Sequence, residues 1–332
     1  MKLRTQLLAG LAATALTAAA LPVMAQDLKI AFLAASSQNG YNQAIWTGIQ
    51  QAATELGGVQ VEIYDGAFDS TKQFSQVEDL IANGGFNAII ITPNDTVGIA
   101  PALEEATGAG LTVATALFPV GPELNEMEPQ VPGLTTTVAA DPAKGATAQA
   151  EAVVAYCADK DPCNVAVIMG QLIYPFDNLR YDAFKTVLGQ HANIKIVATG
   201  EGNYDPDTSL KAMQDIIQAN PKIDVVLSNA DQHLVGAEIA LSDAGIDPAS
   251  LYTMGGGANQ ITIDAIRAGT IDATLAEYPV SMGAAALKAV VQTLKGETAP
   301  TWIDPTTLGS APAIITKEWL DANPDFKAEW QG

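Results

Sequence analysis

Short apolar runs recur along the chain and alternate with segments of ten or more residues in which apolar positions repeat at helical spacing. The runs have the length and composition of β-strands, and they cover 28–33, 59–64, 88–91, 111–115, 165–169, 194–199, 225–227, 251–254 and 271–275. The helical segments cover 41–56, 71–83, 97–108, 143–156, 178–189, 208–219, 233–244, 259–268 and 282–294. This alternation predicts an α/β protein with parallel sheets built from right-handed crossover units.

The strand count is high for one open sheet, and the alternation divides into two similar halves near residues 138–141. We therefore predict two doubly wound parallel-sheet lobes. A (β/α)₈ barrel is the alternative, and the long loop over 118–133, rich in Pro, Gly and Glu, argues against it. Polar, aromatic loops after strands in both halves favour two sheets that face one another.

Residues 1–25 have the order of a secretory signal. Lys2 and Arg4 precede an uncharged Ala/Leu run over 7–20, and Val23-Met24-Ala25 forms a cleavage site. A retained membrane anchor is the alternative, but the run is short and rich in alanine. We expect cleavage before Gln26 and a periplasmic protein.

The chain is strongly acidic, with 37 Asp and Glu against 16 Lys and Arg and a net charge of −21. Such a chain is repelled by nucleic acid and by anionic membrane surfaces. Because 48% of the residues are apolar and recur in regular runs, the acidity does not indicate disorder.

Two cysteines, Cys157 and Cys163, flank a polar segment that contains Pro162. In an exported chain this pair predicts a structural disulfide. A metal pair or a redox pair is the alternative, and five intervening residues fit neither CxxC chemistry nor the usual zinc spacing.

Amides, carboxylates and aromatic rings follow most of the predicted strands, where open α/β sheets bind their ligands. Amides and carboxylates bond hydroxyl groups, and rings cover the C–H faces of sugars. Single members such as Asp141, Asp205 or Asn94 also fit helix caps or turns, so the prediction depends on repetition across loops. The predicted ligand-binding residues are Gln38, Asn39, Tyr41, Asn42, Asn94, Phe118, Tyr174, Phe176, Asn178, Arg180, Tyr204, Asp231 and Glu277.

Seven segments together carry a resemblance to a known family: "KIAFLAASSQNGYNQAIWTGIQQAATELG", "DSTKQFSQVEDLIANGGFNAIIITPND", "AADPAKGATAQAEAVV", "NLRYDAFKTVL", "YDPDTSLKAMQDII", "VLSNADQHLVGAEIAL" and "IRAGTIDATLAEYPVSMGAAAL". They span nearly the whole chain after residue 25. The chain resembles the periplasmic solute-binding proteins of sugar ABC transporters, in the ribose/galactose-binding group with the type I, LacI-like fold.

The resemblance implies two lobes joined by a three-strand hinge, with crossings near 138–141, 277–279 and 304–308. The N-terminal lobe would comprise 26–139 plus 278–306, and the C-terminal lobe 140–277 plus 307–332. It also implies a monomer without cofactor or metal that closes over a sugar or sugar alcohol and delivers it to an inner-membrane ABC permease.

The family's pocket positions correspond to Asn39, Tyr41, Asn178, Tyr204, Ala230, Gly257 and Glu277. The chain departs from the sugar binders at several of them. Ala116-Leu117 replaces an Asp-Arg pair, Gly257 an aspartate, Asn178 an arginine and Glu277 an amide, while Arg180 matches the next arginine. With two charged anchors lost and one carboxylate gained, a standard aldopyranose is disfavoured as ligand.

Glu277 has three candidate roles, because a buried carboxylate needs a partner. It could pair with Arg180, bond several hydroxyls of a polyol, or meet the ammonium group of an amino sugar or similar cation.

Two other function classes fit parts of the sequence. A secreted hydrolase with paired carboxylates is possible on composition, but the sequence has no GxSxG motif, no histidine cluster and no P-loop. His191 and His233 are predicted to be exposed, and "GGGAN" lacks dinucleotide-binding spacing, so we expect no catalytic residue. A ligand sensor for a membrane receptor would use the same fold.

Overall fold

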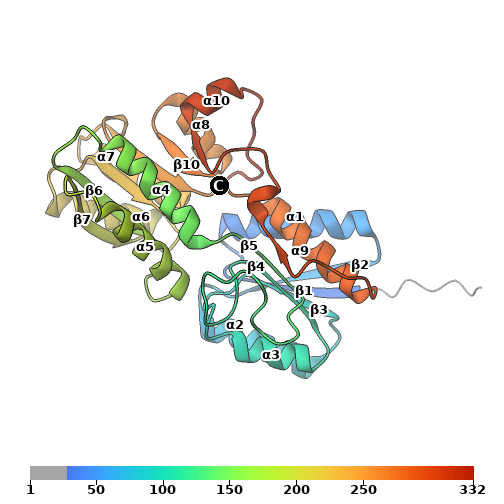
Figure 1. Ribbon diagram of the computed structural model, residues 1–332. Helices are drawn as coiled ribbons and strands as arrows, with labels where there is room; N and C mark the ends of the chain where they lie inside the picture. The colour runs from blue at the N-terminus through green and yellow to red at the C-terminus, as the bar shows by residue number, and fades with distance from the viewer. Residues whose placement is uncertain (1–27) are drawn as a thin grey trace, which may run out of the picture.

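The computed structural model describes residues 28–332, so the predicted signal at 1–25 lies outside the described part of the chain. These residues form two α/β lobes that lie next to each other (Figure 1). Each lobe contains a six-stranded sheet with helices on both faces. The prediction of two parallel-sheet lobes is therefore confirmed.

The sheet of the N-terminal lobe has the order β11-β5-β4-β3-β1-β2 with all neighbours parallel. Its strands are β1 (Leu28–Ala34), β2 (Val59–Asp65), β3 (Ala88–Ile91), β4 (Thr112–Leu117), β5 (Thr136–Ala139) and β11 (Trp302–Ile303). Helices α1 (Gly40–Leu56) and α9 (Pro279–Leu294) cover one face, and α2 (Ser70–Asn83) and α3 (Ala100–Gly108) cover the other. Because both faces are covered, the central strands are continuously apolar.

The sheet of the C-terminal lobe has the order β12-β10-β9-β8-β6-β7, and only the edge strand β12 is antiparallel among its described pairings. The strands are β6 (Cys163–Met169), β7 (Ile194–Glu201), β8 (Val225–Ser228), β9 (Tyr252–Gly256), β10 (Ala273–Leu275) and β12 (Ile314–Thr316). Helices α4 (Pro142–Tyr156) and α5 (Pro175–Leu188) pack on one face, and α6 (Pro206–Ala219), α7 (Asp231–Asp243) and α8 (Gln260–Ala268) on the other. The short helix α10 (Lys317–Ala322) follows β12.

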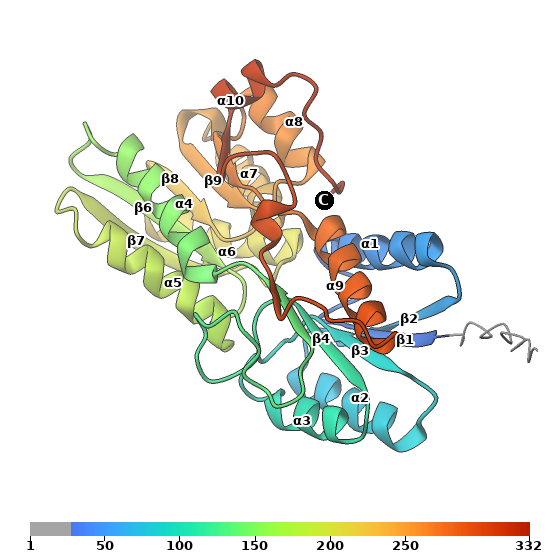
Figure 2. The ribbon, with the colours of Figure 1, turned by 45° about the vertical axis from the view of Figure 1, so that its right-hand side comes forward.

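The chain passes between the two sheets after β5, after β10 and after β11 (Figure 2). Asp141 and Asp205 cap helices, as their place before a proline allows: Asp141 accepts from the backbone of α4 and Asp205 from that of α6. The sequence pattern did not predict strands β5, β11 and β12 or helix α10, each of which has two to six residues.

The predicted disulfide between Cys157 and Cys163 is confirmed, and it joins the end of α4 to the start of β6. Both cysteines are fully buried in the core between α4, α5 and the sheet. Among the described helices, none has the length and hydropathy of a membrane span.

Helices α1 and α9 cross at backbone contact through two glycines. A Cβ atom at Gly48 would lie 1.9 Å from the carbonyl oxygen of Val280, and one at Gly283 would lie 2.0 Å from that of Ile45. This contact fixes the separation between α1, which carries Tyr41, and α9, which begins two residues after Glu277.

We predict that Gly48→Ala or Gly283→Ala lowers the free energy of unfolding by about 1–3 kcal/mol, because the added methyl group forces the helices apart. Gly108→Ala in α3, where nothing lies within 4 Å, is the control and should be neutral or stabilising by up to about 1 kcal/mol. Urea unfolding measures both. Equal stability of the Gly48 and Gly108 variants would contradict this account of the crossing.

Candidate functional site

The two lobes enclose a cavity of about 60 Å³ outside the carboxyl ends of their central strands, called here the interlobe cavity. Residues from both lobes line it, as expected for a site at the edges of two facing sheets. Ten of the predicted ligand-binding residues line it: Asn39, Tyr41, Asn42, Asn94, Phe118, Tyr174, Phe176, Arg180, Tyr204 and Glu277.

Three predicted residues do not line the interlobe cavity. Gln38 is exposed and donates to Ser37 Oγ at 3.3 Å, next to the mouth of the first strand. Asn178 lies in the first turn of α5, where its amide donates to the backbone carbonyls of Leu172 and Tyr174. The structure thus gives both side chains a local partner: a neighbouring hydroxyl for Gln38 and backbone carbonyls for Asn178.

The third, Asp231, is fully buried beneath the cavity wall. Its carboxylate accepts from Thr274 Oγ1 at 2.7 Å and from the Asn259 backbone N–H at 3.1 Å, so it ties α7 to β10 and α8. Its carboxylate therefore does not line the interlobe cavity. Burial raises the pKa of Asp231 to about 7, against the hydrogen bond from Thr274.

Among the other residues that line the interlobe cavity, five have a polar or aromatic side chain: Phe68, Thr92, Gln171, Asn229 and Gln232. Asn229 and Gln232 follow β8, so their place after a strand was a usable signal. Phe68 lies in a turn between β2 and α2, and its φ of 53° is in the left-handed region. Leu117 and Tyr204 line the same cavity with φ values of 74° and 56°. Such backbone conformations persist where the surrounding structure imposes them.

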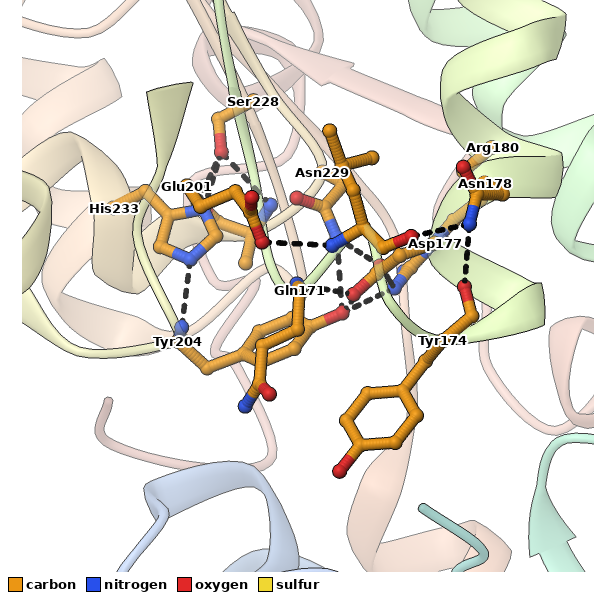
Figure 3. A network of polar contacts seen from close by, with 12 residues as sticks. Gln171, Tyr174, Asp177, Asn178, Arg180, Glu201, Tyr204, Ser228, Asn229 and His233 are labelled. Atoms are coloured by element: carbon orange, nitrogen blue, oxygen red, sulfur yellow. Dashed lines mark hydrogen bonds and ion pairs between the residues drawn. The ribbon is translucent and has the colours of Figure 1, made fainter. Parts of the chain in front are cut away.

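Four side chains form a hydrogen-bonded network in the C-terminal lobe (Figure 3). Arg180 Nη2 donates to Asp177 Oδ1 at 2.6 Å and to Tyr204 Oη at 2.5 Å, and Tyr204 Oη donates to the same carboxylate oxygen at 2.6 Å. Asn229 Nδ2 adds two longer contacts of 3.2 Å to these oxygens. Burial lowers the pKa of Arg180, but Tyr204, Asp177 and Glu277 outweigh it and leave the pKa raised. The guanidinium therefore stays charged.

A second set of contacts fixes the ring of Tyr204. Its backbone N–H donates to His233 Nε2 at 2.9 Å, and His233 Nδ1 lies 2.8 Å from Ser228 Oγ. The prediction that His233 is exposed was wrong: it is fully buried, and burial lowers its pKa to about 3, so the imidazole is neutral. The ring of Tyr204 packs over Gly170, where a Cβ atom would lie 2.2 Å from Tyr204 Cζ.

Aromatic side chains bring the two lobes into contact across the interlobe cavity. Phe118 of the N-terminal lobe stacks on Phe176 of the C-terminal lobe with centroids 4.0 Å apart, and Phe68 stacks on Tyr204 at 5.8 Å. Tyr174 Oη donates to the Phe68 carbonyl oxygen at 2.8 Å. The lobes are thus closed on each other around a small polar and aromatic cavity.

Several polar groups that line this cavity have no protein partner in the described part of the chain. Tyr41 Oη, Thr92 Oγ1, Arg180 Nε and Asn229 Oδ1 are buried without a hydrogen bond. Glu277 is half-buried, its carboxylate lies close to Tyr41 Oη, and no ion pair involves it in the described part of the chain. The expected alternative of a Glu277–Arg180 ion pair is not formed: the ion pair of Arg180 in the described residues joins its Nη2 atom to Asp177. Burial raises the pKa of Glu277, partly offset by the charge of Arg180.

The segment 329–332 links the lobes beside this site, and Figures 1 and 2 place the end of the chain between them. Gln260 and Ile261 of the C-terminal lobe donate backbone hydrogen bonds to the carbonyls of Trp330 and Gln331. Trp330 Nε1 donates to the Gly257 carbonyl oxygen at 2.8 Å. This segment is thereby attached to the lobe that carries β9 and α8.

The same segment enters the core of the other lobe. The buried indole of Trp330 meets Tyr41 edge-on, with ring centroids 5.4 Å apart. Glu329 accepts from the backbone N–H of Ser281, the third residue of α9, at 3.0 Å. Trp330 thus supports a cavity-lining ring from behind, a role that the sequence did not reveal because the contact joins residues 289 positions apart.

A second, larger cavity of about 620 Å³ lies on the hinge side and is called here the hinge-side cavity. It lies against the crossing segments, with Ala140, Asp141, Tyr278 and Asp304 in its wall. No group of three or more metal-binding side chains occurs among the described residues.

Comparisons with known proteins agree with this geometry. A family model described as periplasmic binding protein domain matches residues 30–298. The chain belongs to this family. The ribose import binding protein of Bacillus subtilis (strain 168) is 28% identical over 274 residues, which cover 82% of this chain and 83% of the relative. The galactofuranose-binding protein of Escherichia coli (strain K12) is 26% identical over 228 residues, 68% and 69% of the two chains.

Solved structures share the fold of this periplasmic binding protein. An ABC transporter solute binding protein from Bacillus halodurans C-125, solved with bound myo-inositol, has a TM-score of 0.77 at 21% identity. The match covers 91% of this chain and 98% of that structure. At this identity the likeness concerns the fold, and the residues at the site are this chain's own.

We predict that Trp330→Ala lowers the free energy of unfolding by about 3–5 kcal/mol, because it leaves a cavity between the lobes. Trp302→Ala is the matched control, since Trp302 is 39% exposed and less packing is lost. Thermal and urea unfolding measure the difference. An equal cost for both variants would contradict the interlobe role of Trp330.

Asp231 gives a pH prediction. A carboxyl group whose pKa rises from 3.8 to about 7 on folding stabilises the fold most at low pH, and this contribution is lost as pH rises between the two values. The stability of the wild type relative to Asp231→Asn should therefore fall from pH 4 to pH 7, by up to about 4 kcal/mol. Urea unfolding of both proteins across this range measures it, and a constant difference would contradict burial of this carboxyl.

Proposed function

We propose that this protein is the solute-binding component of an ABC importer and that it binds a sugar or sugar alcohol between its two lobes. The ligand bridges the lobes and shifts the population toward the closed form, without chemical change. The closed lobes then present their surfaces to an inner-membrane permease.

The observation that carries this proposal is the set of unpartnered polar atoms around the interlobe cavity. Tyr41 Oη and Thr92 Oγ1 come from one lobe, and Arg180 Nε and Asn229 Oδ1 come from the other. Buried polar groups in folded proteins are nearly always hydrogen-bonded, so these groups need a ligand or water. The set mixes a pure donor, a pure acceptor and two hydroxyls, which suits ligand hydroxyls because each can donate and accept.

The aromatic rings supply the apolar part of the site. Phe118 and Phe176 stack on each other at 4.0 Å, between the lobes. When a ring or carbon chain enters, its C–H faces replace part of this ring–ring contact, and the lobes close on the ligand rather than on each other. Because one apolar contact replaces another, separating the two lobes costs little free energy, and closure of the lobes depends on the bound ligand.

The family and its relatives support the class of ligand. The relatives are a ribose and a galactofuranose binder, and one solved neighbour holds myo-inositol, all of them polyhydroxylated molecules. Family membership also supports a periplasmic location and an ABC permease as partner. We further propose cleavage near residue 25 and action as a monomer without catalysis.

Glu277 has two remaining roles. Its carboxylate faces Tyr41 Oη closely enough that, after burial, its charge is the next cause of the raised pKa of Tyr41. We assign it to ligand hydroxyls, because a carboxylate accepts from several at once. A protonated amino group on the ligand is the alternative.

We predict that Tyr41→Phe weakens sugar binding about tenfold and leaves stability unchanged, because the lost hydroxyl has no protein partner. Tyr181→Phe is the matched control: its hydroxyl bonds Thr199 Oγ1 at 2.7 Å away from the cavity, so it should cost about 1 kcal/mol of stability and no affinity. Thermal shift and calorimetry with D-ribose, D-galactose, xylitol, erythritol and myo-inositol measure both.

The same panel, extended to D-galactosamine and serinol, decides the role of Glu277. Tighter binding of D-galactose and the polyols than of D-galactosamine and serinol supports the assignment of Glu277 to ligand hydroxyls. Tighter binding of the two amines would contradict it. Absence of a shift with every carbohydrate and polyol, or turnover of any of them by NMR, would overturn the proposed function.

A further inference from the structure

The hinge-side cavity adjoins the interlobe cavity. Five residues line both: Tyr41, Leu117, Phe118, Arg180 and Glu277. Small-molecule pockets in proteins typically measure 300–1,000 Å³. The interlobe cavity at about 60 Å³ falls well below this range, and the hinge-side cavity at about 620 Å³ lies within it.

An unusual loop builds one wall of the hinge-side cavity. Strands β4 and β5 are parallel neighbours, yet residues 118–135 connect them without a helix. Parallel neighbours are normally joined through a helix, and structureless connections of this length in compact domains are mostly functional.

The loop has a defined conformation. Val120, Val131 and Leu134 are buried in the core of the N-terminal lobe, and Met127 is buried at the cavity wall. Gln130 Nε2 donates to the Glu123 carbonyl oxygen at 2.8 Å, and the Glu123 backbone N–H donates back to Gln130 Oε1 at 2.9 Å. These contacts hold residues 125–128 against the cavity as a fixed wall.

Two unpartnered polar side chains lie where the cavities meet. Tyr41 is 8% exposed and Arg180 is 9% exposed, and Tyr41 Oη and Arg180 Nε have no hydrogen-bond partner among the described residues. Because both residues line both cavities, a ligand atom that satisfies them lies at the junction. The larger free volume next to that junction is the hinge-side cavity.

The charges of the hinge-side cavity limit what can occupy it. Its wall contains the carboxylates of Glu126, Glu128, Asp141, Asp304 and Glu277. Lys144 is the other cation besides Arg180, and it lies 4.0 Å from Asp141. An anionic group would be repelled, whereas hydroxyls find many acceptors.

We propose that the hinge-side cavity is a second subsite, so that the ligand is a two-unit carbohydrate, a disaccharide or glycoside, whose second unit carries no negative charge. One unit meets the unpartnered groups at the junction, and the other lies between the β4–β5 loop, the start of α4 and the crossing segments. This proposal rests on the proposed function and specifies the class of ligand for the same site.

Calorimetry on the full mature chain tests it with matched sets: D-galactose with lactose and melibiose, D-glucose with maltose, cellobiose and trehalose, and D-glucose 1-phosphate as the anionic member. At least one disaccharide should bind tenfold or more tighter than its parent monosaccharide, and the phosphate should not bind.

Ala148→Trp narrows the hinge-side cavity from α4 and should weaken that disaccharide at least tenfold more than its monosaccharide. Ala313→Trp, in the wall at an exposed position, repeats the test if the first variant does not fold. Ala322→Trp, exposed on α10 outside both cavities, is the control and should change neither affinity.

Monosaccharides that bind as tightly as every disaccharide, or an Ala148→Trp variant that weakens both equally, would overturn the second subsite and leave the proposed function standing. Failure of every sugar and polyol to bind contradicts both. Tight binding of D-glucose 1-phosphate would show that the acidic wall does not exclude anions, and it would overturn this proposal.

Discussion

The buried ion pair between Arg180 and Asp177 determines how the rest of the site behaves. Among the described residues that line the interlobe cavity, Arg180 is the one Lys or Arg side chain, and its Nη2 atom is already committed to Asp177 and Tyr204. Breaking a buried pair by removing one partner costs about 3–5 kcal/mol, so the pair persists whatever occupies the cavity. Glu277 and the unpartnered atoms of Tyr41, Thr92 and Asn229 are therefore left facing the cavity.

Closure follows from the same arrangement. Polar atoms that lack partners come from both lobes, so a polyhydroxylated molecule satisfies them only when the lobes approach each other. The rings of Phe118 and Phe176 already meet between the lobes, which keeps the two surfaces complementary. The segment 329–332 adds a connection beside the three crossings, with Trp330 joining Gly257 of one lobe to Tyr41 of the other. Lobe movement and the position of Tyr41 are consequently coupled.

Much of the fold could be predicted, because apolar periodicity is local. Strands such as 88–91 and helices such as 71–83 agree with the structure, and the rule that ligands bind at strand ends located Asn39, Tyr41 and Tyr204. The rule fails where a side chain has a closer partner than the cavity. Asp231 follows β8 as Asn229 does, yet Thr274 and Asn259 take its carboxylate.

Other features depend on contacts between distant segments and carry no local signal. His233 is buried by the fold of α7 against the turn at Tyr204, and nothing near it in the sequence marks that contact. Phe68 enters the site through a left-handed turn, and Trp330 through a segment that returns to the first lobe. The sequence also could not decide between Asp177 and Glu277 as the partner of Arg180, because both are acidic. In the structure Asp177 Oδ1 lies 2.6 Å from Arg180 Nη2.

The most direct test of the central claim is a crystal structure of the protein with its tightest-binding carbohydrate or polyol. The account predicts ligand oxygens within hydrogen-bond distance of Tyr41 Oη, Arg180 Nε, Asn229 Oδ1 and Glu277, with Arg180 still paired to Asp177. A ligand bound elsewhere, with these atoms still unpartnered, would contradict it.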